Sequence, residues 1–154
     1  MAINKVVNKS TKSHGAMRNV LEYVLRDEKI KEGFVEITGP YDADTINYDS
    51  VYQAWLAEKR LWDKDSGRMY AHNIISFHKD EAVTPGDVLE IGKQCAEKFF
   101  SGFQCVIGVH QDKEHLHCHI EFLFSFFQIF NFRIVFFNGY RHYYIISFKG
   151  YFRI

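Results

Sequence analysis

Four of the eight histidines fall within the ten residues from His110 to His119, a spacing that could hold a metal ion. His117 and His119 are two apart in an alternating run, so on a β-strand both side chains point to one face. His110 ends an apolar run, residues 104–109, that also indicates a strand. A turn over residues 111–115 would bring His110 beside the other two. Three imidazoles then form a metal site that leaves positions open for water or substrate.

Three other side chains of this stretch need separate interpretations. Asp112 lies at the mouth of the predicted turn, and His115 lies next to the bend, so we interpret His115 as a loop residue. Cys118 points to the face opposite His117 and His119, which predicts a packed thiol and not a ligand. Two histidines on one strand would also fit a surface pair. A third histidine one hairpin away favours the metal site.

Length and composition restrict the class of protein. The chain has 154 residues, which is enough for one domain with a real core. Three widely spaced cysteines argue against a disulfide scaffold and favour a reducing compartment. No stretch approaches the roughly 20 apolar residues of a membrane span, and the first residues lack the apolar region of a signal peptide. We therefore expect a cytoplasmic protein with no membrane span.

The formal net charge is zero, but the charges are unevenly distributed. The first twenty residues contain no acidic side chain and carry Lys5, Lys9, Lys12 and Arg18. A basic arm of this kind can contact nucleic-acid phosphates even on a neutral protein. An ordinary solvated terminus would show the same charges, so the pattern alone leaves both interpretations open.

Periodicity predicts alternating strands and helices. Helical spacing indicates helices over residues 16–26, from about 50 to 62 and from 85 to 100, with Asp49 or Ser50 capping the second and Thr84 capping the third. Leu61, Ile91 and Phe99 are among the expected core contacts of these helices. The predicted strands are residues 2–8, 34–38, 69–77, 104–109 and 116–120. The last two form a hairpin, so we predict an α+β domain with a largely antiparallel sheet flanked by helices.

The composition changes abruptly after residue 121. Residues 122–154 contain ten phenylalanines and four tyrosines and no acidic residue. So many aromatic side chains are hard to cover in a chain of this length. We therefore divide the chain into a domain over residues 1–121 and an atypical tail over 122–154. A frameshift or truncation of the gene is one hypothesis for the tail.

The pattern His110-x-Asp112-x4-His117-x-His119 resembles the third motif of plasmid mobilisation relaxases, members of the HUH endonuclease superfamily. Residues 19–25 (NVLEYVL), followed by 27–29 (DEK), resemble the first motif, which carries a nucleophilic tyrosine. Segments 75–77, 84–85 and 96–100 resemble the region between these motifs. The resemblance covers about residues 1–121. It departs at Leu123, where such relaxases usually carry asparagine.

The resemblance implies an HUH-type fold and a specific activity. A relaxase nicks one strand of plasmid DNA at a transfer origin, and its tyrosine becomes joined to the 5′-phosphate. Tyr23 matches that tyrosine; without the resemblance we would interpret it as a helix-surface residue. Asp112 would orient a metal-binding histidine or take the tyrosine proton, or it is a simple turn residue. Ser76 matches a residue that contacts DNA near the nick, although a polar strand residue would also fit. His72 is interpreted as structural or as a minor contact.

The resemblance also implies a metal and partners. Three neutral imidazoles leave a divalent ion its full charge, which suits a phosphate substrate. The family suggests Mg²⁺ or Mn²⁺, whereas imidazole ligands alone favour Zn²⁺. The expected partners are single-stranded or supercoiled plasmid DNA and accessory relaxosome proteins. Two rival functions remain: an inactive relaxase remnant that binds metal or DNA without nicking, and a metal-dependent hydrolase in which Tyr23 is incidental.

Overall fold

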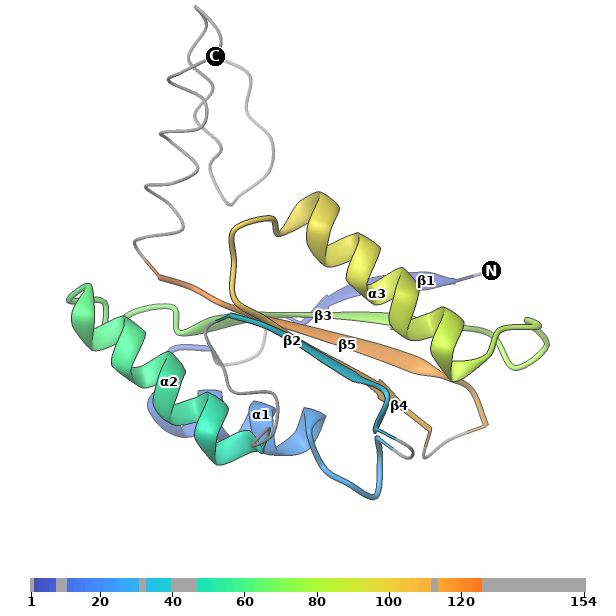
Figure 1. Cartoon of the computed structure of the whole chain (residues 1–154), viewed down its shortest axis with the longest axis horizontal. Coiled ribbons are helices and arrows are strands. Elements are labelled where there is room, and N and C mark those ends of the chain that lie inside the picture. The colour runs from blue at the N-terminus through green and yellow to red at the C-terminus, as the bar shows by residue number, and fades with distance from the viewer. Residues whose placement is uncertain (1, 8–10, 31–32, 40–46, 112–113, 126–154) are drawn as a thin grey trace, which may run out of the picture.

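The computed structural model describes residues 2–7, 11–30, 33–39, 47–111 and 114–125 (Figure 1). Strands and helices follow in the predicted order, which confirms the α+β class. The elements are β1 (Ile3–Val7), α1 (His14–Val24), β2 (Val35–Thr38), α2 (Tyr48–Leu61), β3 (Tyr70–Ser76), α3 (Pro85–Phe99), β4 (Cys105–His110) and β5 (His117–Leu123).

The five strands form one sheet in the order β1-β3-β5-β4-β2, and each neighbouring pair is antiparallel. Figure 1 shows α3 on one face of this sheet and α1 and α2 on the other. The predicted antiparallel sheet flanked by helices is therefore confirmed. Strand β5 continues to Leu123. The proposed division after residue 121 stays a prediction, since residues 126–154 lie outside the described part.

The register of the central strands places polar side chains on a single face of the sheet. Register partners on adjacent antiparallel strands share a face, and so do residues two apart along each strand. Three successive rows on the α1 face therefore run across β3, β5 and β4. The rows are Ser76, His117 and His110; Ile74, His119 and Gly108; and His72, Glu121 and Val106.

Each helix begins at a side chain that caps it. Ser13 Oγ accepts a hydrogen bond from the backbone N–H of Ala16 at 3.1 Å, so α1 begins two residues earlier than predicted. The predicted cap of α2 was wrong. Asn47 caps this helix, and Ser50 completes its capping box. The predicted cap of α3 by Thr84 is confirmed.

Three predicted core contacts were wrong. Leu61 is 73% exposed, because at about 100° per residue it lies well away from the α2 stripe that contains Trp55. The fully buried Lys59 continues that stripe, and its ammonium group donates to the carbonyl oxygens of Arg68 and Phe124. Ile91 and Phe99 lie at the edge of the buried stripe of α3 and are partly exposed.

We predict that Gly92→Ala destabilises the fold, because α3 packs on the sheet through this glycine. A Cβ at Gly92 would lie 2.5 Å from Cys118 Sγ and 2.9 Å from Ile107 Cγ2, both in the buried core. Overpacking of this kind costs about 1–3 kcal/mol. Gly86→Ala in the same helix is the matched control, since its nearest neighbour would lie 3.7 Å away. Urea denaturation of both variants measures the difference; equal midpoints would contradict the close packing of α3.

Candidate active site

The last turn of α1 brings Tyr23 to the histidines of β4 and β5. The Tyr23 ring lies edge-on to His110, with centroids 5.1 Å apart, and to His119, with centroids 5.5 Å apart. Tyr23 is 37% exposed, whereas His110 and His119 are buried. A tyrosine that solvent can reach therefore lies directly beside two of the three predicted metal ligands.

Gly108 explains how α1 comes so close to β4. A Cβ at this position would lie 2.9 Å from Val24 Cγ1 and 3.0 Å from the Val24 carbonyl oxygen. The same carbonyl lies 3.1 Å from His110 Nε2. Because a carbonyl only accepts hydrogen bonds, His110 donates through Nε2, so Nδ1 is the nitrogen that would bind a metal. The residue after Tyr23 thus fixes the orientation of a predicted metal ligand.

The three predicted metal-binding histidines occupy neighbouring positions on the α1 face. The ring centroids of His110 and His119 are 4.2 Å apart, and those of His117 and His119 are 6.4 Å apart. His117 is the register partner of His110 across the β4–β5 pair. His115 lies outside the strands, in a bend, and its ring is 4.3 Å from that of His117.

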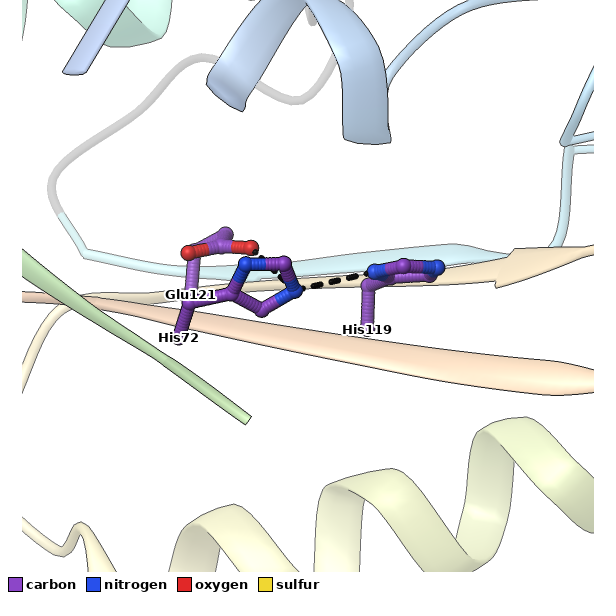
Figure 2. A group of neighbouring side chains, drawn as sticks. All are labelled: His72, His119 and Glu121. Carbon is purple, nitrogen blue, oxygen red and sulfur yellow. Dashed lines mark hydrogen bonds and ion pairs between the residues drawn. The ribbon is translucent and has the colours of Figure 1, made fainter. Parts of the chain in front are cut away.

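Two residues that the sequence did not assign to the site extend it on the other side of His119. Figure 2 shows the His72 ring between the carboxyl group of Glu121 and the ring of His119. His72 Nε2 is 3.0 Å from His119 Nδ1 and 3.0 Å from Glu121 Oε1. Strand alternation could have predicted the position of Glu121, because this acidic residue of an apolar strand is two residues from His119 and therefore on the same face.

Burial disfavours the charged forms of these groups. Burial, followed by the neighbouring His110, lowers the pKa of His72 to about 4. Burial is also the main cause that lowers the pKa of His119 to about 2, with smaller effects from the other histidines and Lys29. Burial raises the pKa of Glu121 well above its usual range. Burial therefore acts against the charged forms of both partners in the contact between His72 and Glu121.

Two overlapping sets of ligands meet at His119. One is the predicted set of His110, His117 and His119. The other is His72, His119 and Glu121, whose ligand atoms all lie within 4.8 Å of one another. Among the described residues, neither carboxyl oxygen of the fully buried Glu121 makes a hydrogen bond of acceptable geometry.

Two of the three predicted histidines have features of metal-binding side chains, although among the described residues the group with ligand atoms within 4.8 Å of one another is His72, His119 and Glu121, so the predicted set stays a prediction. A metal-binding histidine needs an unprotonated ring nitrogen, and it usually directs its other ring nitrogen to a carbonyl or another acceptor. His110 meets the second condition through Val24. The lowered pKa of His119 meets the first. A proton on Nδ1 of His119, donated to His72 Nε2, would leave its Nε2 as the ligand.

The remaining predicted residues are spread around this site. Ser76 lies beside His117 in register. Lys5 is exposed on β1, opposite Ile74 and in the same row as His119, and Lys12 is exposed just before α1. Arg18 is turned toward α2, where its guanidinium lies 3.4 Å from the Asp49 carboxylate. Asp112 and Lys9 lie outside the described residues.

Two further residues, Cys118 and Lys29, lie on opposite sides of the question of which side chains belong to the site: Cys118 is packed away from it, and Lys29 contacts it. The predicted packed thiol of Cys118 is confirmed, because it is fully buried on the α3 face and burial raises its pKa to about 12. Lys29 was assigned no role from the sequence, yet its ammonium nitrogen lies 4.8 Å from the centroid of the Tyr23 ring. Lys29 therefore holds a positive charge over the ring of the candidate nucleophile.

Comparison with known proteins identifies the family. The family model described as relaxase, MobA/VirD2-like, nuclease domain matches residues 23–123, which is more than half of the chain. The chain belongs to the MobA/VirD2-like relaxase family. The match begins at Tyr23 and includes all three predicted metal-binding histidines of this relaxase domain, which confirms the resemblance inferred from the motifs.

Two curated relatives of this relaxase domain show how much of a longer protein the chain matches. Group II intron-interrupted relaxase LtrB from Lactococcus lactis subsp. cremoris (strain MG1363) is 39% identical over 138 residues, covering 76% of this chain and 24% of the relative. Protein rlx from Staphylococcus aureus is 34% identical over 77 residues, covering 49% of this chain and 24% of the relative. The chain therefore spans about a quarter of the length of these relatives. In its described part, none of the helices has the length and apolarity needed to cross a membrane.

Proposed function

We propose that this domain nicks one strand of plasmid DNA at a transfer origin and becomes covalently joined to it through Tyr23. The observation that carries this proposal is the position of Tyr23, whose ring lies within 5.5 Å of the rings of His110 and His119. A tyrosine-dependent phosphoryl transfer needs a phenol that the substrate can reach and imidazoles beside it that can bind a metal.

The proposed reaction exchanges one phosphodiester for another. The Tyr23 oxygen attacks the scissile phosphorus, the bond to the 3′-oxygen breaks, and a 5′-phosphotyrosine and a free 3′-hydroxyl result. The phenol loses its proton to a nearby base, and the departing 3′-oxygen gains one, so the proton count is unchanged. Asp112 is the proposed base, as its position in the motif implies. Because the new ester conserves the bond energy, the strand can be rejoined without ATP.

We assign metal binding to His110, His117 and His119. A bound Mg²⁺, Mn²⁺ or Zn²⁺ would supply positive charge to the scissile phosphate. The alternative set fits this role less well, since all three of its members are buried, whereas His117 of the predicted set is partly exposed. His72 instead orients His119 through the contact between His72 Nε2 and His119 Nδ1, as outer residues do at many metal sites, and Glu121 packs against His72.

The DNA strand is proposed to cross the exposed end of this face. Ser76, half-buried beside His117, is in position to contact the strand near the nick. Lys5 and Lys12 are exposed cations that would bind its phosphates, with Lys9 in the same arm. Arg18 would contribute only if it leaves Asp49. We propose plasmid DNA as the substrate, accessory relaxosome proteins as partners and the bacterial cytoplasm as the location.

One assay separates the three functions. The chain is incubated with Mn²⁺ and a supercoiled plasmid carrying the DNA upstream of its own gene, and the products are resolved after denaturation. A covalent protein–DNA adduct supports the proposed relaxase. Binding without nicking supports an inactive remnant, a reading favoured by Leu123, which packs fully buried where such relaxases usually carry asparagine. Nicking without an adduct supports a metal-dependent hydrolase.

We predict that Glu121→Gln preserves metal binding. If Glu121 only packs against His72, the amide of the same shape changes metal affinity by about tenfold or less, the low end of the usual cost of changing an outer residue, because Glu121 makes no hydrogen bond with the described residues that would be lost. If Glu121 were itself a ligand, the amide would weaken binding far more, because metal ligands bind through deprotonated groups. Isothermal calorimetry with Mn²⁺ measures the difference. A loss as large as that of His117→Ala would instead favour the set of His72, His119 and Glu121.

A further inference from the structure

The turn after α1 holds Lys29 against the end of β4. The Lys29 carbonyl accepts a hydrogen bond from the backbone N–H of Gln111 at 2.9 Å, and Gln111 directly follows His110. The Lys29 N–H donates to the Arg26 carbonyl at 2.8 Å, which closes the turn. Ile30, the next residue, packs near Gly108. The backbone of Lys29 is thus fixed between the helix that carries Tyr23 and the strand that carries His110.

The side chain of Lys29 returns from this turn to the Tyr23 ring. Its ammonium nitrogen lies 4.8 Å from the ring centroid, within the range of a cation–π contact.

We propose that Lys29 binds the scissile phosphate at Tyr23, a role that rests on the proposed relaxase function. The phosphodiester is an anion before the attack, and it remains an anion when its phosphorus is bonded to the tyrosine oxygen. The ammonium group of lysine offers three donors to non-bridging oxygens and gives up no proton in doing so. Lys29 therefore binds the phosphate from the side on which Tyr23 lies, and the histidine cluster lies on the other side of the same phosphate.

This role differs from that of the basic arm. Lys5 and Lys12 are exposed and would bind phosphates along the strand, which raises affinity for any DNA. Lys29 is half-buried and lies over the nucleophile, so its contact is confined to the phosphate that reacts. Loss of Lys29 should consequently slow adduct formation more than it weakens DNA binding.

The test compares Lys29→Met and Lys29→Arg with a matched control, Lys98→Met. Lys98 also places its ammonium group over an aromatic ring, 5.5 Å from the centroid of Phe99, but on α3 across the sheet. Single-stranded oligonucleotides tiling the DNA upstream of the gene serve as probes. Affinity is measured by fluorescence anisotropy with a chelator present, and adduct formation is measured in single turnover with Mn²⁺.

We expect Lys29→Met to slow adduct formation by about 10- to 100-fold, the usual effect of losing one hydrogen bond to a charged group. The slope of log affinity against log salt should fall by about 0.7, as for one phosphate contact on a single strand. Lys29→Arg should restore most of the rate, and Lys98→Met should match the unmodified chain. Equal thermal midpoints establish that the variants are folded.

The outcomes separate the two proposals. If the unmodified chain forms an adduct and Lys29→Met forms it equally fast with an unchanged salt slope, the role of Lys29 is wrong and the relaxase function stands. If no variant forms an adduct but Lys29→Met alone lowers the salt slope, the phosphate contact stands and the relaxase function is wrong. If Lys29→Met and Lys98→Met slow adduct formation and lower the salt slope equally, the effect comes from the lost net charge alone, and the proposal is wrong.

Discussion

Tyr23→Phe is expected to abolish the covalent protein–DNA adduct, lowering its rate of formation by at least about 10⁴-fold, as removal of a catalytic nucleophile does. The substitution removes only the hydroxyl group. The ring keeps its edge contacts with His110 and His119 and its contact with Lys29, so the neighbouring side chains stay in place. The measurement is the amount of DNA retained with protein after denaturation, as a function of time.

Tyr52→Phe is the control for this experiment, because Tyr52 lies on α2 and packs at the edge of the core. It should form adduct at the rate of the unmodified chain. Persistence of the adduct in Tyr23→Phe would show that another group attacks the phosphate. Persistence of nicking without an adduct would favour attack by water, and Tyr23 would then be a helix-surface residue with no chemical role.

His119→Ala is expected to have the second-largest effect, a loss of metal affinity of roughly 100-fold or more. His119 is the centre of the cluster: its ring lies 4.2 Å from that of His110 and 5.2 Å from that of His72. It belongs to both possible ligand sets, so the prediction does not depend on which set binds. Calorimetric titration with Mn²⁺, and separately with Zn²⁺, measures affinity and stoichiometry.

His78→Ala provides the control, since His78 is exposed after β3 and pairs only with surface groups that the structure describes. Its metal affinity should equal that of the unmodified chain. An unchanged stoichiometry and affinity in His119→Ala would reject a metal site at this cluster. His117→Ala then distinguishes the sets, because only the set with His110 requires it.

The sequence alone was enough to predict the hairpin of β4 and β5 and the face of the sheet that its histidines share. Strand alternation has a period of two, so the positions of His117, His119 and Cys118 follow from parity alone. It was also sufficient for the order of elements, because each helix has a long apolar stripe. Both are local properties, readable from a short window of residues.

The sequence did not predict the neighbours of His119 that come from distant strands. The pairing of β3 with β5 brings His72 beside Glu121, and no local pattern specifies which strand lies next to which. Lys29 was missed for a related reason, because its position depends on how a turn packs against β4. The exposure of Leu61 shows the limit of residue type: a leucine on a helix is not buried when the apolar stripe lies elsewhere.

Peptide mapping of the covalent product tests the central claim, that Tyr23 and the histidine cluster form one DNA-cleaving site. The chain is incubated with the plasmid and Mn²⁺, digested with nuclease and protease, and analysed by mass spectrometry. We predict a nucleotide 5′-phosphate attached to Tyr23, present in the unmodified chain and absent from His119→Ala. A nucleotide on another residue, or one on Tyr23 that forms equally well in His119→Ala, would contradict the claim.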